Sequence, residues 1–164
     1  MRQSLIAAAL CLALSAQAQD QSATFQIKAL TPETALAAAQ AALASCRAKG
    51  YQVGVAVVDR SGLTQVFLRD RFAGAHTLDV ATNKAWTAAS FRTSTLELAT
   101  ESQPGRPMSG IRSTPRMLAV GGGVVIEGGG SIYGAIGVSG APGGDADDAC
   151  ARAGIKAIAD KIEF

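Results

Sequence analysis

The sequence predicts an α/β (α+β) fold in which an antiparallel sheet of about five strands is flanked by helices. The predicted elements follow the order helix, hairpin, helices, hairpin, helix, which is typical of an antiparallel sheet with helices packed against it. The 164 residues suggest one domain, and 48% hydrophobic with 17% charged residues is a globular composition. The formal net charge of +2 gives no basic surface of the kind that binds nucleic acid.

The first helix and the hairpin after it have clear boundary signals. Thr31 can cap the helix with its hydroxyl, Pro32 suits the first turn, and Gly50 suits the end. The following "YQVGVAVVDRSGLTQVFLRD" contains alternating valines, which indicate a strand. Residues 59–62 form the predicted turn and residues 63–69 the return strand.

A second helix is predicted within residues 73–92, with Thr77 as its cap. A short further helix is expected over 93–101, and the loop 102–116 follows with three prolines and two glycines. Long loops in compact domains are often functional. The inward face of the second helix is predicted to be a stripe of mostly small residues: Leu78, Ala81, Ala85, Ala88 and Ala89.

The stretch "GGGVVIEGGGSIYGAIGVSGAPGG" predicts a second hairpin and the entry into the last helix. Strands are expected at 124–127 and 131–139, and a short strand at 117–120 supplies the fifth. No Gly-Lys-Ser/Thr sequence marks a phosphate loop. Ser139 follows a strand as a hydrolase nucleophile would, but the single histidine, His76, precedes it, against the order of that triad. The glycines are therefore interpreted as turn and packing residues.

The N-terminal "MRQSLIAAALCLALSAQAQD" has the pattern of an export signal. Arg2 gives a positive start, residues 4–15 form an apolar run too short to span a bilayer, and an Ala-Gln-Ala site follows. We expect a signal peptide over 1–18, a polar leader over 19–29 and a single domain over 30–164. The mature protein would be periplasmic or secreted, with no stable membrane insertion.

Two cysteines would remain after cleavage, Cys46 near the end of the first helix and Cys150 near the start of the last. In an oxidising compartment two such thiols often pair. If the two helices pack antiparallel on one face of the sheet, the thiols come close. The sequence leaves open a disulfide or two small buried thiols.

Three segments, "VAVVDRSGLTQVFLRD", "KAWTAASF" and "GGGVVIEGGGSIYGAIGVSGA" with the Asp-rich helix start after it, together resemble the GlcG/HbpS family over about residues 30–162. The resemblance implies a profilin-like fold with helices on both faces of the sheet. It also implies a homo-oligomer, a dimer or larger and possibly an octamer. Some members are exported haem-binding proteins with roles in haem sensing or oxidative stress, and many have no established activity.

Haem would be held without a covalent link, as haem b, because the chain has no Cys-x-x-Cys-His motif. His76 is the candidate axial ligand, since the positive end of a helix disfavours a protonated ring. If it is helical, His76 lies about 160° around the helix from Leu78, and so points away from the core.

The other candidate haem-pocket residues are cations for the propionates, aromatic groups that can contact the macrocycle and one soft side chain. Each also has an ordinary explanation as a solvated basic edge, a core residue or a loop anchor. Tyr51 and Tyr133 are expected to be packing residues of strands. The candidates are Arg69, Arg71, Phe72, Lys84, Trp86, Phe91 and Met108.

The leading functional prediction is an exported non-covalent haem-binding protein, a carrier or sensor or a protein of oxidative stress, and not a catalyst. One alternative is an enzyme or enzyme accessory that acts on a small organic acid or aldehyde. Its pocket would be formed by the loop 102–116 and the glycine turns, with Ser109, Arg112 or Ser139 as polar contacts. A second alternative is a structural subunit of a periplasmic assembly, without a small ligand.

Overall fold

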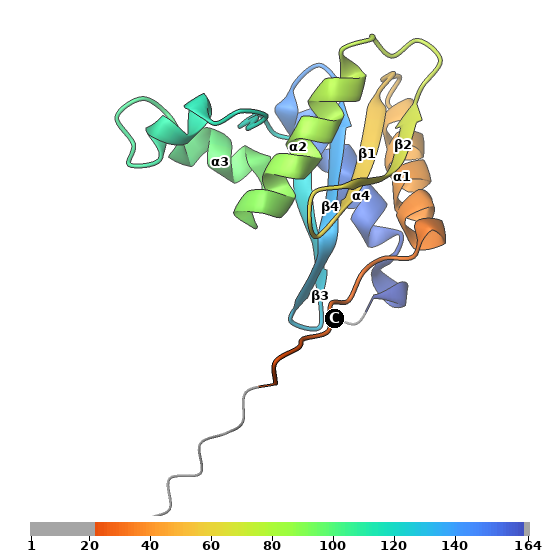
Figure 1. Cartoon of the computed structure of the whole chain (residues 1–164). Coiled ribbons are helices and arrows are strands. Elements are labelled where there is room, and N and C mark those ends of the chain that lie inside the picture. The colour runs from red at the N-terminus through yellow and green to blue at the C-terminus, as the bar shows by residue number, and fades with distance from the viewer. Residues whose placement is uncertain (1–21, 163–164) are drawn as a thin grey trace, which may run out of the picture.

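In the computed structural model, which describes residues 22–162, four strands form one antiparallel sheet in the order β2-β1-β4-β3 (Figure 1). The predicted signal peptide and residues 19–21 of the predicted leader lie outside the described residues. The α+β class is confirmed, with four strands instead of about five. The strands are β1 (Gly54–Asp59), β2 (Thr64–Arg69), β3 (Gly123–Gly128) and β4 (Ser131–Ser139).

The missing strand is the predicted one at 117–120, which pairs with no neighbour in the sheet. The backbone N–H of Leu118 donates instead to the Thr87 hydroxyl, at 2.9 Å. Met117 is buried beside Leu98 in a small cluster outside the sheet. The segment therefore forms no strand: the Val120 N–H donates to the Leu118 carbonyl at 3.0 Å, and neighbouring helices hold the segment through side chains.

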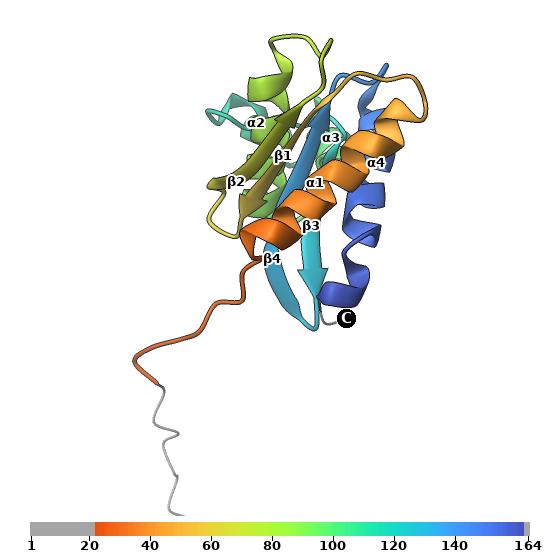
Figure 2. The ribbon, with the colours of Figure 1, turned by 90° about the vertical axis from the view of Figure 1, so that its right-hand side faces the viewer.

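Helices cover both faces of the sheet, as expected. Helices α1 and α4 lie side by side across one face, and α2 covers the other (Figure 2). Helix α3 and the loop after it extend beyond the sheet on the side of α2 (Figure 1). The helices are α1 (Pro32–Arg47), α2 (Thr77–Phe91), α3 (Thr95–Glu101) and α4 (Gly144–Lys156), with short 3₁₀ turns at Ser109–Ser113 and Ala159–Lys161.

The two faces of the sheet are packed with side chains of different size. On the α1/α4 face, valines and isoleucines such as Val55, Ile126 and Ile136 form the main core. On the α2 face, the buried residues are mostly alanines of the helix. Gly137 of β4 faces the backbone of α2, where a Cβ atom would collide with the Ala81 carbonyl and lie 2.7 Å from the Ala85 nitrogen. Helix α2 therefore lies very close to the sheet.

The predicted start of α2 needs two corrections. His76, not Thr77, is the N-cap residue, and its side chain makes no capping hydrogen bond. Thr77 is instead buried, and its hydroxyl donates to the Gly74 carbonyl at 2.7 Å. Leu78 is 51% exposed and does not share the buried alanine face of the helix.

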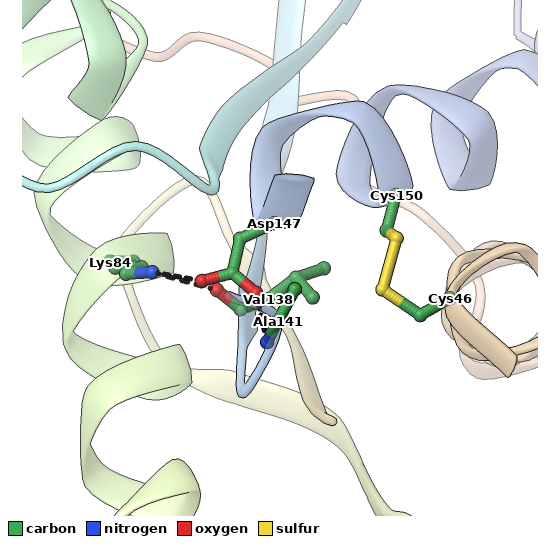
Figure 3. Close-up of a disulfide and its surroundings, with 6 residues drawn as sticks. All are labelled: Cys46, Lys84, Val138, Ala141, Asp147 and Cys150. Atoms are coloured by element: carbon green, nitrogen blue, oxygen red, sulfur yellow. Dashed lines mark hydrogen bonds and ion pairs between the residues drawn. A yellow bond between two sulfur atoms is a disulfide. The ribbon is translucent and has the colours of Figure 1, made fainter. Parts of the chain in front are cut away.

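The disulfide between Cys46 and Cys150 is present, with the two Cα atoms 5.6 Å apart. It joins the last turn of α1 to the middle of α4 in the interior of the α1/α4 face (Figure 3). Both cysteines are fully buried. The packing of these two helices on one face, which the sequence left open, brings the thiols together.

Within residues 22–162 no helix has both the length and the apolar character that crossing a membrane requires.

Candidate functional site

A surface cavity of about 670 Å³ lies at the end of the sheet where β4 stops and α2 begins. Its volume is within the range of small-molecule and cofactor sites. Four segments form its walls: residues 50–52 after α1, residues 72–80 at the start of α2, residues 118–120, and the turn 139–144 between β4 and α4. The cavity is therefore built from loops and helix ends at one end of the strands.

The cavity walls are largely apolar. Phe72 is 79% exposed on the rim, and Val120 is also exposed. Exposed apolar side chains around a concave surface indicate a ligand or partner site. The other apolar side chains on the wall are Val80, Leu118, Ala141 and Pro142.

His76 lies on the wall of this cavity and is exposed. Its ring packs over Gly74, where an added Cβ atom would lie 2.7 Å from Nδ1 and 2.6 Å from Cε1. The absence of a side chain at Gly74 is what lets the imidazole lie against the backbone here. The predicted axial ligand thus lies on the wall of this cavity.

A buried ion pair between Lys84 and Asp147 also lines the cavity. The Lys84 Nζ atom lies 2.7 Å from Asp147 Oδ2 and 3.1 Å from the Val138 carbonyl oxygen. The second Asp147 oxygen accepts the backbone N–H of Ala141 at 3.0 Å (Figure 3). Burial raises the pKa of Asp147, and the bond from Lys84 opposes that rise.

A second ion pair lies directly before the His76 loop. The guanidinium of Arg47 donates to both oxygens of Asp70, with Nε–Oδ2 at 2.7 Å and Nη2–Oδ1 at 2.8 Å. The bond from Arg47 is the main cause that lowers the pKa of Asp70, although the carboxylate is fully buried. The same carboxylate accepts the backbone N–H of Arg71 at 2.8 Å, so it holds the beginning of the loop that carries Phe72.

Of the basic residues predicted for the propionates, only Lys84 lines the cavity, and it is paired with Asp147. Arg69 uses its guanidinium to hold the Ala73 carbonyl at 2.8 Å. Arg71 is exposed beside Phe72, next to the cavity rim. Among the described residues the Arg71 guanidinium makes no hydrogen bond or ion pair, although its charge helps to lower the pKa of Asp70. Arg71 therefore remains the candidate cation for a propionate.

Three further candidates lie away from the cavity. Trp86 packs against Gly62 of the β1–β2 turn, and Arg116 stacks over its ring at 4.9 Å from the centroid. Phe91 packs against the small cluster around Leu98. Met108 is exposed in the loop before the first 3₁₀ turn and is not part of the cavity wall.

The loop 102–116 does not line the cavity, which corrects the pocket expected for a small-acid enzyme. Arg112 is engaged within the loop region, where it donates to the carbonyls of Ser102 at 2.7 Å and Ala99 at 3.1 Å. Ser139 does lie on the cavity wall, at the end of β4. The loop follows α3, which extends beyond the sheet, and therefore lies away from the cavity (Figure 1).

Sequence reasoning missed two parts of this site. Tyr51 is a cavity residue in the loop after Gly50, not a strand residue, whereas Tyr133 is buried in the main core as expected. The leading interpretation also treated the glycine turn 139–144 as a packing element, although it forms one wall of the cavity. Only the small-acid alternative placed the glycine turns in a pocket. The sequence did contain one indication of both. Tyr51 follows the end of a helix and the turn 139–144 follows the end of a strand, and loops at such ends commonly line cavities.

In the part of the chain that the structure describes, no three His, Cys, Asp or Glu side chains gather as a metal site would require.

The fold and cavity define a small α+β domain in which a helix start and a glycine turn line one cavity at the end of the sheet. The chain belongs to the HbpS-like family, whose model, described as "Haem degrading protein HbpS-like", matches residues 30–156. This match confirms the family resemblance of the sequence.

Solved structures show the same fold in relatives. The crystal structure of a double mutant of HbpS from Streptomyces reticuli is 35% identical, with a TM-score of 0.77 over 95% of this chain and 97% of that one. The crystal structure of a PduOC:heme complex is 30% identical, with a TM-score of 0.76 over 80% of this chain and 96% of that one. The corrinoid adenosyltransferase PduO of Citrobacter freundii is 35% identical over 57% of this chain, but the match spans only 29% of that enzyme.

Proposed function

We propose that this protein binds haem b without a covalent link in the 670 Å³ cavity, with His76 as the axial ligand. The observation that carries the proposal is the position of His76, the single histidine of the chain, on the wall of a largely apolar cavity. The similarity to a protein crystallised as a heme complex, over 80% of this chain, supports the choice of ligand.

The residues of the cavity fit such a group. Haem needs an axial ligand, an apolar slot and cations for its propionates. His76 supplies an imidazole, while Phe72, Val80 and Leu118 supply apolar surface. Arg71, exposed beside Phe72, is the proposed cation for a propionate. When bound, haem would supply an iron atom that can bind or exchange a further ligand.

The proposal includes an exported carrier or sensor that acts as a homo-oligomer in the periplasm or outside the cell. The buried Cys46–Cys150 disulfide supports an oxidising compartment. The family description concerns haem degradation, whereas we propose binding without turnover of the macrocycle. Incubation of the haem complex with a reductant and oxygen separates the two, because a carrier keeps its Soret band and a degrading enzyme loses it.

A hemin titration of the purified protein, followed by absorption spectroscopy, tests the proposal. The wild type should saturate with a shifted Soret band, and His76→Ala should lose or alter that band because the axial nitrogen is gone. Met108→Leu is the matched control, since Met108 lies off the cavity and should leave the spectrum unchanged.

Absence of a Soret shift in the wild type would refute haem binding. An unchanged spectrum in His76→Ala would refute the ligand assignment alone, and a changed spectrum in Met108→Leu would move the site to the loop 102–116. A homo-oligomer would be recognised by light scattering of the same samples.

A further inference from the structure

The Lys84–Asp147 pair links α2, the end of β4, the turn 139–144 and the segment that enters β3, which all lie at the cavity or lead directly from it. Lys84 belongs to α2, the helix that starts with His76, and lies about 12 Å further along the helix axis at 1.5 Å per residue. Its ammonium bonds the last part of β4 through the Val138 carbonyl. Asp147 belongs to α4 and completes the link between the two helices.

The same aspartate holds the glycine turn that forms the opposite wall. Its Oδ1 atom accepts the N–H of Ala141, at 3.0 Å, inside the turn 139–144. Glycines restrain a backbone weakly, so this turn depends on such contacts for its position. Asp147 therefore fixes the turn, and Lys84 fixes Asp147 relative to α2.

A third segment packs onto the pair through Gly122. An added Cβ atom at Gly122 would lie 2.7 Å from the Asp147 Cβ and 3.1 Å from the Lys84 Nζ. Gly122 has a φ of 118°, and its carbonyl accepts the Val138 N–H at 2.9 Å. The segment that leads from Val120 on the cavity wall into β3 is thus seated directly on the ion pair.

We infer that Lys84 and Asp147 are positioning residues, which set the distance between His76 on α2 and the glycine turn on the opposite wall and do not bind the charge of the ligand. This inference rests on the proposed haem site. Lys84 is 2% exposed, and two of the three N–H groups of its ammonium are directed to protein acceptors. Its charge is therefore compensated inside the protein and is not offered to a propionate.

The double variant Lys84→Met/Asp147→Asn tests this role, because it leaves no unpaired buried charge and keeps an oxygen that can accept from Ala141. It is titrated with hemin and with hemin dimethyl ester, in which both propionates are masked. We expect both affinities to fall by the same factor, about 10-fold or more, as for lost outer support of a ligand. The Soret band of the remaining complex should shift, because α2 carries His76.

Amide hydrogen exchange on the ligand-free protein gives a second readout that needs no haem. The Ala141 N–H should exchange about 10-fold faster in the double variant, in line with a local opening about 1.4 kcal/mol easier. Lys156→Met, which removes an exposed lysine at the end of α4, is the matched control and should change neither affinity nor exchange.

A loss of affinity for hemin with none for the dimethyl ester would overturn the inference, since Lys84 would then bind a propionate directly. Unchanged Ala141 exchange in the double variant would also overturn it. If the wild type bound neither compound, the proposed haem function would fail, and the exchange rates alone would decide the positioning role.

Discussion

The Arg47–Asp70 and Lys84–Asp147 pairs each fix one wall of the cavity, but their surroundings differ. Arg47 is half-exposed and donates two hydrogen bonds to a fully buried carboxylate. Lys84 is buried and donates one hydrogen bond to a carboxylate that is itself nearly covered. The pKa of Asp70 is lowered, chiefly by Arg47, whereas burial raises the pKa of Asp147.

The contrast shows that pairing with a cation does not by itself decide the ionisation of a buried carboxylate. A planar guanidinium can satisfy both oxygens and still reach water, so its own desolvation is small. A buried ammonium satisfies one oxygen and loses its own hydration. Both pairs hold segments of the cavity in place, but only in the Lys84 pair are both side chains almost fully buried.

The largest expected effect is that of Lys84→Met. It leaves Asp147 buried without its cation, which should reduce the free energy of unfolding by about 3–5 kcal/mol in a urea titration. Lys84→Met/Asp147→Asn should recover most of that loss, because the unpaired charge is gone. A single variant as stable as the wild type would show that Asp147 is neutral or reaches water.

Removal of the disulfide should have the second-largest effect on the free energy of unfolding. Cys46 adjoins Arg47, and Cys150 lies one turn after Asp147, so the bond ties together the helices that carry the two pairs (Figure 3). Cys46→Ala/Cys150→Ala should lower the free energy of unfolding by about 2–5 kcal/mol. Dithiothreitol should produce a similar loss in the wild type and none in the double variant. A loss in both would show that the reductant acts elsewhere.

Arg47→Met should have a smaller effect than Lys84→Met on the midpoint of urea unfolding. Water can enter where the half-exposed guanidinium stood, and the Arg71 N–H still donates to Asp70. Arg47→Lys should be intermediate, because an ammonium cannot make the bidentate contact. If Arg47→Met were as damaging as Lys84→Met, exposure of the cation would not explain the contrast.

The smallest effect is the pH dependence of stability. Asp70 has a lowered pKa, so its contribution is present above the unfolded value of about 3.9 and is lost as the pH falls toward the folded value. Asp147 has a raised pKa, so its ionisation lowers stability as the pH rises from about 3.9 through the folded value.

Urea titrations from pH 3 to 7, a range chosen about the aspartate values, measure these slopes. Asp70→Asn should flatten the loss of stability in acid, and Asp147→Asn should remove the fall of stability that Asp147 causes as the pH rises above about 3.9. Slopes that change in the same direction in both variants would contradict the opposite pKa shifts.

Much of the fold could be predicted from local signals. Thr31 accepts the Thr34 N–H at 3.3 Å as an N-cap, and Gly50 and Gly62 take the positive φ angles that ends and turns require. The strand 131–139 was predicted with the bounds that the structure gives it. The prediction of a strand at 117–120 is wrong, because the backbone of Leu118 bonds to the Thr87 side chain on a helix and not to another strand. No local sequence pattern indicates such a contact.

The candidate site was only partly predictable. His76 could be identified as the single imidazole at a helix start, and Phe72 as an aromatic residue near it. The assignment of Lys84 to a propionate did not foresee Asp147, which lies 63 residues away in sequence. Two aspartates at the start of α4, Asp147 and Asp148, are buried and paired with Lys84 and Arg152, which no local pattern reports.

The sequence by itself determined the helices, the two hairpins, the family and the single histidine, because caps, turns and side-chain periodicity act over a few residues. Only the tertiary structure decided that the glycine turn, Tyr51 and His76 line one cavity. It also decided that Cys46 meets Cys150, and that Lys84 is committed to Asp147. Each of these contacts joins residues that are far apart in the chain. The distances between them depend on how closely each helix approaches the sheet. Small alanines set that approach for α2, and larger core side chains set it for α1 and α4.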